Sequence, residues 1–246
     1  MFTKNFLFKD FIKKKENKIL IRHLKEIINN KNEIIKSLGN NYKYSYSANL
    51  IKNLKKFKDI RIFGMGGSSL GANAIYDYLK YKINKNFYFL SNLNNKTFSK
   101  KKYLNLVISK SGNTLETIVN SNIFIRKIDK NIFVTENKKN IIRELSQKLK
   151  AEIIDHNNYI GGRYSVLSEV GMLPAELMGL KASKFKQFNV LIRNKAFLSS
   201  MVSNVSNIIS LINKKKFNSV ILNYDETADN FLKWYQQLVA ESTGKK

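Results

Sequence analysis

Two loops of this sequence hold side chains that could bind an anion. The first lies within residues 106–117, LVISKSGNTLET, where an apolar run leads into a hydroxyl-rich loop and a helical pattern follows. A strand–loop–helix unit of this kind brings backbone N–H groups, hydroxyls and the positive end of a helix dipole to one place, which suits a phosphate. An ordinary turn before a capped helix would use the same residue types, so this loop alone leaves both interpretations open.

The second loop, residues 64–71, reads GMGGSSLG and lies between a predicted strand and a helical pattern. Its glycines allow a sharp turn and a close approach of the backbone to a ligand. A dinucleotide fingerprint is disfavoured, because Ser69 occupies the third glycine position and Ser91 and Asn92 follow the next strand in place of a carboxylate. The two loops together favour one small phosphorylated ligand, and we expect no nicotinamide, flavin or other cofactor.

A candidate acid–base pair lies near the end of the chain. Gln237 and Glu241 are four residues apart in the last predicted helix, so both side chains lie on one face. Trp234, Leu238 and Val239 surround them, and we therefore expect at least one side of the pair to be buried. Glu241 could then act as a general base. A solvated surface carboxylate is the alternative.

Arg163 is a candidate binding group for negative charge. It follows Gly161 and Gly162 in a predicted loop after the strand near 152–155. A guanidinium held there could contact an oxyanion or a phosphate. A surface ion pair would use the same residue.

The elements that must position these groups alternate between strand and helix from residue 60 onward. Short apolar runs predict buried strands, and the segments between them show helical periodicity. Strands are predicted near residues 60–63, 87–90, 104–109, 131–135 and 152–155, and helices near 69–81, 114–128, 138–149, 167–179, 184–213 and 226–241. This order predicts an α/β fold with a doubly wound parallel sheet, in which ligands bind at the carboxyl ends of the strands.

The ends of the chain follow other patterns. Residues 5–38 carry a helical apolar rhythm with a break near 30–33, and a short helix is predicted at 45–56. A further strand is predicted at 219–224, and because a lone strand–helix pair cannot bury its own faces, it is expected to open a second α/β unit. Pro174, the single proline, is expected at a helix start or kink.

Composition argues against several classes of protein. The formal charge is +26, but the excess is nearly all lysine and is spread along the whole chain, without the interleaved aromatic residues of a single-strand binder. We expect no nucleic-acid partner, although a positive field would attract anionic metabolites. We also expect no membrane span and no signal peptide. Cysteine is absent, His23 and His156 are far apart and away from carboxylates, and we expect no metal site and a cytoplasmic location.

The four motifs GMGGSSLG, SKSGNTLET, GGRYSVLSEVGMLP and QQLVAESTGK, in this order, resemble the phosphoglucose isomerase family over about residues 60–246. The last two motifs are specific to that family, whereas the first two indicate only the broader sugar isomerase (SIS) domain family. The resemblance implies an aldose–ketose isomerase that interconverts glucose 6-phosphate and fructose 6-phosphate by proton transfer through an enediol, without a cofactor.

The resemblance also implies a role for each matching residue. Glu241 would move a proton between C1 and C2, and Arg163 would stabilise the enediolate. The hexose phosphate would be bound by Gly67, Ser68, Ser109, Lys110, Ser111, Thr114, Thr117, Gly162 and Gln237.

One departure from the family is serious. The family histidine that a neighbouring subunit contributes for ring opening, and a C-terminal lysine, both belong beyond the last motif, and His156 does not match that histidine. We therefore expect a fragment of a longer isomerase that is a homodimer when complete and that can be inactive at this length. The expected parts are a helical lead-in (1–57), a first SIS-like α/β domain (58–182), and a linking helix with the incomplete start of a second such domain (183–246).

Two other functions remain open at this point. A non-catalytic phosphosugar-binding module or regulator would keep the loops at 64–71 and 109–117 but would not need Glu241 or Arg163. A related isomerase could act on another phosphosugar, such as mannose 6-phosphate.

Overall fold

The structure, a computed structural model, describes residues 17–29, 32–93, 97–216 and 218–244. The chain forms two compact units. The α/β unit comprises Lys43–Phe185 and Asn223–Lys246, and the helical unit comprises Met1–Tyr42 and Lys186–Leu222.

A five-stranded parallel sheet is the centre of the α/β unit. The strand order is β2-β1-β3-β4-β5, and every neighbouring pair is parallel. The strands are β1 (Asp59–Phe63), β2 (Asn86–Leu90), β3 (Leu104–Ile108), β4 (Lys130–Glu136) and β5 (Glu152–His156). All five predicted strands are confirmed, with small shifts at their ends.

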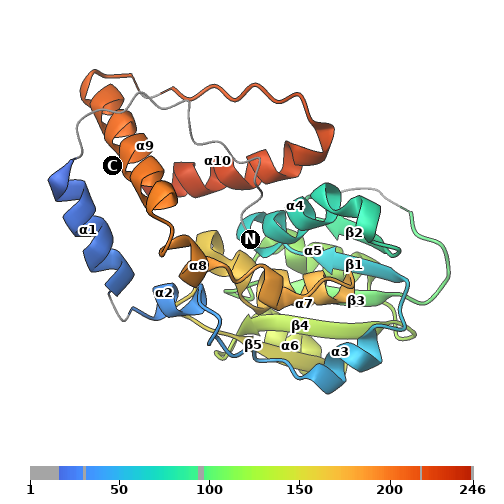
Figure 1. Cartoon of the computed structure of the whole chain (residues 1–246). Helices are drawn as coiled ribbons and strands as arrows, with labels where there is room; N and C mark the ends of the chain where they lie inside the picture. Colours follow the sequence, from blue (N-terminus) through green and yellow to red (C-terminus); the bar gives the residue numbers. More distant parts are fainter. Residues whose placement is uncertain (1–16, 30–31, 94–96, 217, 245–246) are drawn as a thin grey trace. The chain divides into compact units, whose positions relative to one another are not determined.

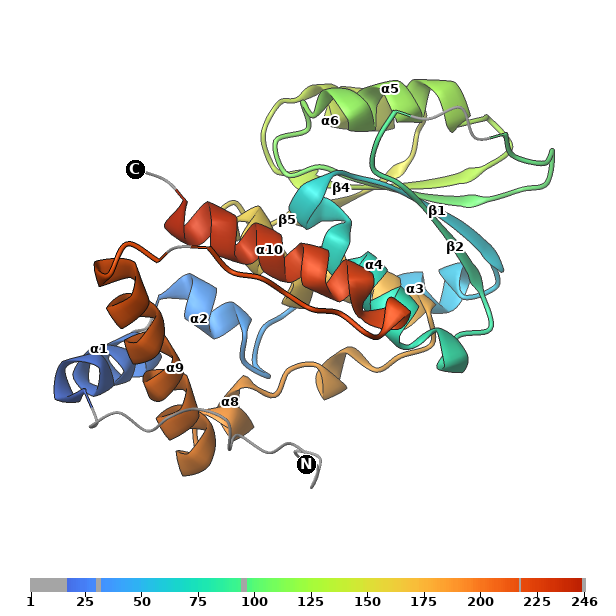
Figure 2. The ribbon, with the colours of Figure 1, turned by 90° about the horizontal axis from the view of Figure 1, so that it is seen from above.

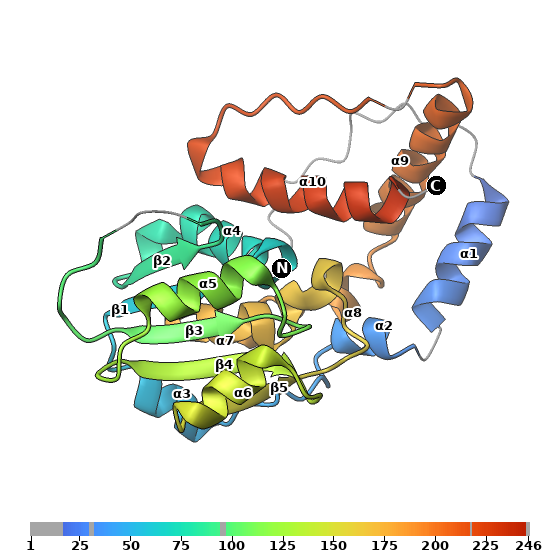
Figure 3. The ribbon, with the colours of Figure 1, turned by 180° about the vertical axis from the view of Figure 1, so that it is seen from behind.

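Helices cover both faces of this sheet (Figures 1 and 2). One face carries α5 (Leu115–Phe124) and α6 (Ile141–Lys148), which lie in front of the strands in Figure 3. The other face carries α3 (Ala48–Leu54), α4 (Leu70–Tyr78) and α7 (Glu169–Leu177), and α10 (Asp229–Thr243) packs on α4. The predicted doubly wound α/β class is confirmed. Pro174 lies inside α7 rather than at its start.

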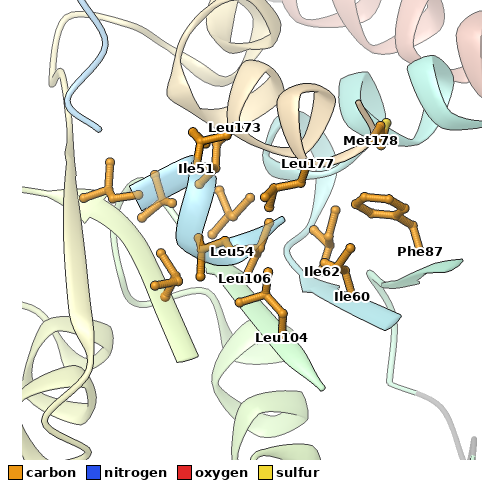
Figure 4. Close-up of a cluster of buried hydrophobic side chains, with 14 of the residues drawn as sticks. Ile51, Leu54, Ile60, Ile62, Phe87, Leu104, Leu106, Leu173, Leu177 and Met178 are labelled. Atoms are coloured by element: carbon orange, nitrogen blue, oxygen red, sulfur yellow. The ribbon is translucent and has the colours of Figure 1, made fainter. Parts of the chain in front are cut away.

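Alternating side chains of each strand build the two cores, as the pleat of a strand requires. Ile60 and Ile62 of β1 meet Leu173 and Leu177 of α7 on one face, and Figure 4 shows this cluster with the β3 and α3 residues that complete it. On the other face Phe63, Val107 and Phe133 pack with Ile142. Because both faces are buried, the strands read as continuous apolar runs, which is why the sequence located them.

A buried ion pair interrupts the apolar core on the α5–α6 face. Arg61 Nη2 lies 2.7 Å from Asp129 Oδ2, and neither side chain is more than 1% exposed. Arg61 Nε also donates to Asn105 Oδ1 at 2.8 Å, and its guanidinium lies 4.3 Å from the centre of the Tyr103 ring. Asp129 and Tyr103 directly precede β4 and β3, so this network belongs to the amino edge of the sheet.

The network sets the ionisation of Asp129. Burial acts to raise the pKa of its carboxyl, but hydrogen bonds from Arg126 and from the Tyr103 N–H, with the charge of Arg61, hold the pKa below its usual value. A carboxyl whose pKa is lower in the folded state stabilises the fold above its unfolded pKa of about 4, and this stabilisation is lost as the pH falls further.

The helical unit contains α1 (Lys18–Asn29), α2 (Glu33–Ser37), α8 (Phe188–Leu191) and α9 (Lys195–Asn213). The predicted helix at 184–213 is wrong as one element, because Asn194 caps a new helix by accepting from the Phe197 N–H at 3.1 Å. The N-terminal part of the pattern predicted at 5–38 lies outside the described residues, and the rest forms α1 and α2.

The strand predicted at 219–224 is also wrong for the described residues. This segment forms no ladder in the part of the chain that the structure describes, and Val220, Leu222 and Tyr224 are 82%, 75% and 93% exposed. Its apolar pattern favours a strand, but a strand exists only where another strand accepts its hydrogen bonds. Among the described helices, none has the length and apolar character needed to cross a bilayer.

Replacement of Asp129 by Asn should lower the free energy of unfolding by about 3–5 kcal/mol, because it leaves a buried guanidinium without its anionic partner. Chemical denaturation measures this change. The control is Glu152→Gln, which removes the exposed carboxylate 3.9 Å from Lys130 and should cost less than about 1 kcal/mol. Equal small losses in both variants would contradict the prediction.

Candidate active site

Three loops meet at the carboxyl edge of the sheet. They follow β1, β3 and β5, and because parallel strands end on the same side, their loops share that edge. They are the turn of residues 64–69, the loop of residues 109–114 and the loop of residues 157–163. Each loop contains residues that were predicted from the sequence to bind a ligand or to act in catalysis.

Ser68 lies where the first two of these loops approach each other. It ends a short 3-10 turn, Gly66–Ser68, between β1 and α4. A Cβ added to Gly64 would lie 2.9 Å from the Ile108 carbonyl oxygen and 3.0 Å from Ser68 Cβ. Ser68 is therefore beside the end of β3, where the 109–114 loop begins.

The hydroxyls of the 109–114 loop make hydrogen bonds within the loop. Ser109 Oγ lies 3.0 Å from Thr114 Oγ1 and accepts from the Gly112 N–H at 3.1 Å. The exposed Ser111 accepts from the Asn113 N–H at 3.3 Å. These contacts fold the loop back on itself and pair the Gly112 and Asn113 N–H groups with its own hydroxyls.

The conformation and surroundings of Gly112 strongly favour glycine at this turn. Its φ is +68°, and an added Cβ would lie 2.0 Å from Asn140 Oδ1. Asn140 caps α6 by accepting from the Arg143 N–H at 2.9 Å, and the Ile142 N–H donates to the Gly112 carbonyl at 3.1 Å. The start of α6 therefore fixes the loop, a role of Asn140 that the sequence analysis missed.

Thr117 and Lys110 flank this loop in different ways. Thr117 lies in the first turn of α5 and is 1% exposed, and its Oγ1 is buried with no hydrogen-bond partner among the described residues. Lys110 Nζ donates to the Asn158 carbonyl at 2.5 Å and lies 3.4 Å from Glu136 Oε1. Lys110 thus ties its own loop to the loop that precedes Arg163.

The backbones of Gly67 and Gly162 are in close contact. A Cβ on Gly67 would lie 2.4 Å from the Gly162 carbonyl oxygen, a distance that no side chain tolerates. Ser165 Oγ lies 2.8 Å from both the Gly67 and Gly162 carbonyls and secures the contact. No role was predicted for Ser165, although its place in the GGRYS motif was a signal that could have found it.

This contact sets Arg163 against the last helix. Arg163 Nη1 donates to the Glu241 carbonyl at 2.6 Å and lies 3.1 Å from Ser242 Oγ, and its Nε lies 3.6 Å from Glu241 Oε2. Gln237 Nε2 donates to Glu241 Oε1 at 2.8 Å. The Arg163 and Glu241 side chains remain 28% and 43% exposed, so a ligand can reach the pair.

Gln237 faces the glycine turn as well as Glu241. Its Nε2 would lie 2.9 Å from a Cβ on Gly66, while its Oε1 is buried and has no hydrogen-bond partner within the described residues. The expected pairing of Gln237 and Glu241 on one helical face is confirmed. The structure therefore forms two clusters, the 109–114 loop and the group of Arg163, Gln237 and Glu241.

We expected both histidines to lie away from carboxylates, and this expectation is wrong. His23 Nδ1 lies 3.1 Å from Glu26 Oε2 on α1, and the buried His156 Nδ1 lies 2.8 Å from Glu169 Oε1. The second pairing spans thirteen residues and could not be read from the sequence. Within the described ranges, His, Cys, Asp and Glu side chains form no group of three that could hold a metal ion.

Fold and site together define an α/β protein with a hydroxyl-rich loop and a carboxylate–guanidinium pair at the same sheet edge. The chain belongs to the phosphoglucose isomerase family, whose model matches residues 13–246. The predicted family resemblance is confirmed.

Curated relatives agree with this family. A glucose-6-phosphate isomerase from Methanocaldococcus jannaschii is 33% identical over 82% of this chain and 54% of its own length. One from Borreliella afzelii is 30% identical over 94% of this chain and 52% of its own length. The chain thus spans about half the length of these relatives. A crystal structure of a hypothetical protein from Thermus thermophilus shares the fold, with a TM-score of 0.69 over 92% of this chain and 60% of its own, at 20% identity.

Replacement of Gly67 by Ala should destabilise the α/β unit by about 1–3 kcal/mol, because the added methyl overpacks the contact with Gly162. Thermal unfolding measures the effect. Gly161→Ala is the matched control, since its Cβ would meet nothing nearer than Tyr164 at 4.0 Å. Equal stability of the two variants would show that the backbones do not meet this closely.

Proposed function

We propose that the protein is an aldose–ketose isomerase that interconverts glucose 6-phosphate and fructose 6-phosphate through an enediol. The observation that carries this proposal is the position of the Arg163 guanidinium beside Glu241, with Gln237 bound to the same carboxylate. Isomerisation needs one base that takes and returns a proton, and a cation at the developing oxyanion.

Glu241 is the proposed base. Its two carboxylate oxygens have different neighbours, with Gln237 at Oε1 and Arg163 at Oε2. These contacts orient the carboxylate, which would remove the proton from C2 of the open-chain aldose and return it to C1. Because the same proton carrier serves both steps, the reaction as a whole gains and loses no proton and needs no redox partner.

Arg163 is the proposed stabiliser of the enediolate. It is anchored through Nη1 to the Glu241 carbonyl and through the Gly67–Gly162 contact to the first loop. A fixed cation requires little reorganisation when negative charge develops, which is the main source of electrostatic catalysis.

The 109–114 loop is the proposed phosphate site, with Ser68, Lys110 and Thr117 beside it. Buried polar atoms normally have partners, so the unpaired Thr117 Oγ1 and Gln237 Oε1 support a polar ligand or ordered water at this edge. Binding energy from the unreacting phosphate would then hold C1 and C2 near Glu241.

The isomerase activity is proposed for the protein at its full natural length. The family's ring-opening histidine and C-terminal lysine are assigned to no residue of this chain. A homodimer, a cytoplasmic location and a second SIS-like domain after residue 183 remain predictions. A non-catalytic phosphosugar module is not favoured, because it has no need of the Arg163–Glu241 pair.

At full natural length, Glu241→Gln should lower the exchange of the C2 proton of glucose 6-phosphate by at least about 10²–10⁴-fold, since the general base is lost. Deuterium uptake followed by NMR measures this rate. Glu226→Gln, at an exposed carboxylate just before α10, is the control and should leave it unchanged. Near-normal exchange in Glu241→Gln would refute its assignment as the base. Parallel assays with mannose 6-phosphate define the sugar preference.

Ser111→Ala should raise the Kd for glucose 6-phosphate by about 3–10-fold, the cost of one lost hydrogen bond to the phosphate. Ser111 is exposed, so the fold should be kept. Isothermal titration calorimetry measures the affinity, with Ser183→Ala, an exposed serine outside all three loops, as control. Unchanged affinity would move the phosphate away from this loop.

A further inference from the structure

A buried histidine lies directly under the loop that carries Arg163. His156 is the last residue of β5 and is 3% exposed. Its Nε2 lies 3.1 Å from the Ile160 carbonyl, so the ring spans the turn that leads to Gly161 and Gly162. A carbonyl oxygen only accepts hydrogen bonds, and Nε2 therefore carries a hydrogen.

The other side of the same ring contacts α7. His156 Nδ1 lies 2.8 Å from Glu169 Oε1, which is a hydrogen-bond distance. Glu169 is the first residue of α7 and is fully buried, and its Oε1 also accepts from the Asn157 N–H at 3.3 Å. A turn hydrogen bond from the Ile160 N–H to the Asn157 carbonyl, at 3.0 Å, closes the loop.

These bonds hold both ends of the turn. Glu169 fixes Asn157 at its start, and His156 fixes Ile160 at its end, where the side chain of Ile160 is fully buried. Only Gly161 and Gly162 then separate Ile160 from Arg163. Gly67 and Ser165 hold Gly162 on one side of this step, and the turn holds Ile160 on the other, so the position of Arg163 depends on both.

We propose that His156 and Glu169 are positioning residues that hold the loop between Asn157 and Arg163 and thereby aim the Arg163 guanidinium at Glu241. The pair touches no substrate. The expected effect of this pair on ligand binding rests on the proposed isomerase function. Its expected effect on the order of the 157–163 loop does not. Buried groups of this kind fix the orientation of neighbouring functional groups when all their hydrogen bonds are satisfied.

Hydrogen–deuterium exchange of the backbone amides tests the positioning without any ligand. His156→Asn keeps a donor on the Glu169 side, and His156→Gln keeps one toward Ile160. Each variant loses one of the two bonds, so the amides of residues 157–164 should exchange about tenfold faster or more while those of residues 104–108 in β3 should not.

Asp129→Asn is the matched control for these variants. This substitution breaks a buried ion pair at the amino edge of the sheet. The amides of residues 157–164 should then exchange no faster than those in the rest of the α/β unit. Unchanged exchange in the loop of both His156 variants, or a rise no greater than in Asp129→Asn, would overturn the proposal. Glu169→Gln provides the same measurement if one His156 variant does not fold.

A binding measurement then connects the loop to Arg163. Arabinonate 5-phosphate is the probe, because its carboxylate takes the place of the enediolate oxygens, and inorganic phosphate is the comparison. His156→Asn and Arg163→Lys should each weaken arabinonate 5-phosphate about tenfold or more and should change phosphate affinity less than about twofold.

The double variant should lose no more affinity than Arg163→Lys alone, because both changes remove the same contact. Additive losses would show that His156 acts independently of Arg163 and would overturn the proposal. If the unaltered protein binds the arabinonate no more tightly than phosphate, the isomerase function fails, and the exchange measurement still decides the positioning role.

Discussion

The arrangement of the site depends on one close contact between two glycine backbones. Gly67, in the middle of its turn, lies against Gly162, and an added methyl would lie 2.4 Å from the Gly162 carbonyl oxygen. Without that approach the loop after β1 and the loop after β5 could not meet, Ser165 could not reach both carbonyls, and Arg163 would not lie against Glu241. The two glycines lack side chains, and this allows their backbones to approach. That approach brings Arg163 next to Glu241.

The two ends of a sugar phosphate require different environments, and the proposed site assigns them to two separate groups of residues. We assign the phosphate to the 109–114 loop, whose hydroxyls are bonded to one another and to the loop backbone and would bind a phosphate without reacting. The group of Arg163, Gln237 and Glu241 offers a carboxylate and a cation, which can exchange a proton and stabilise the resulting charge. Lys110 belongs to the 109–114 loop and donates to the Asn158 carbonyl in the 157–163 loop, so one hydrogen bond joins these two loops.

Much of this could be predicted from the sequence because the signals were local. The strands are buried on both faces and therefore read as apolar runs, and the Gln237–Glu241 pair follows from helical spacing alone. The contacts that could not be predicted join residues far apart in the sequence. The Arg61–Asp129 and His156–Glu169 pairs join segments that only the fold brings together, and residues 219–224 carry a strand pattern without a described neighbour.

The central claim is that Glu241 and Arg163 carry out proton transfer on a sugar phosphate held by the 109–114 loop. The most direct measurement follows glucose 6-phosphate labelled with deuterium at C2 by NMR, with the unaltered protein at full natural length in ordinary water. The account predicts catalytic loss of deuterium from C2, with transfer of part of it to C1 of fructose 6-phosphate. Tight binding of the sugar phosphate with the label fully retained at C2 would contradict it.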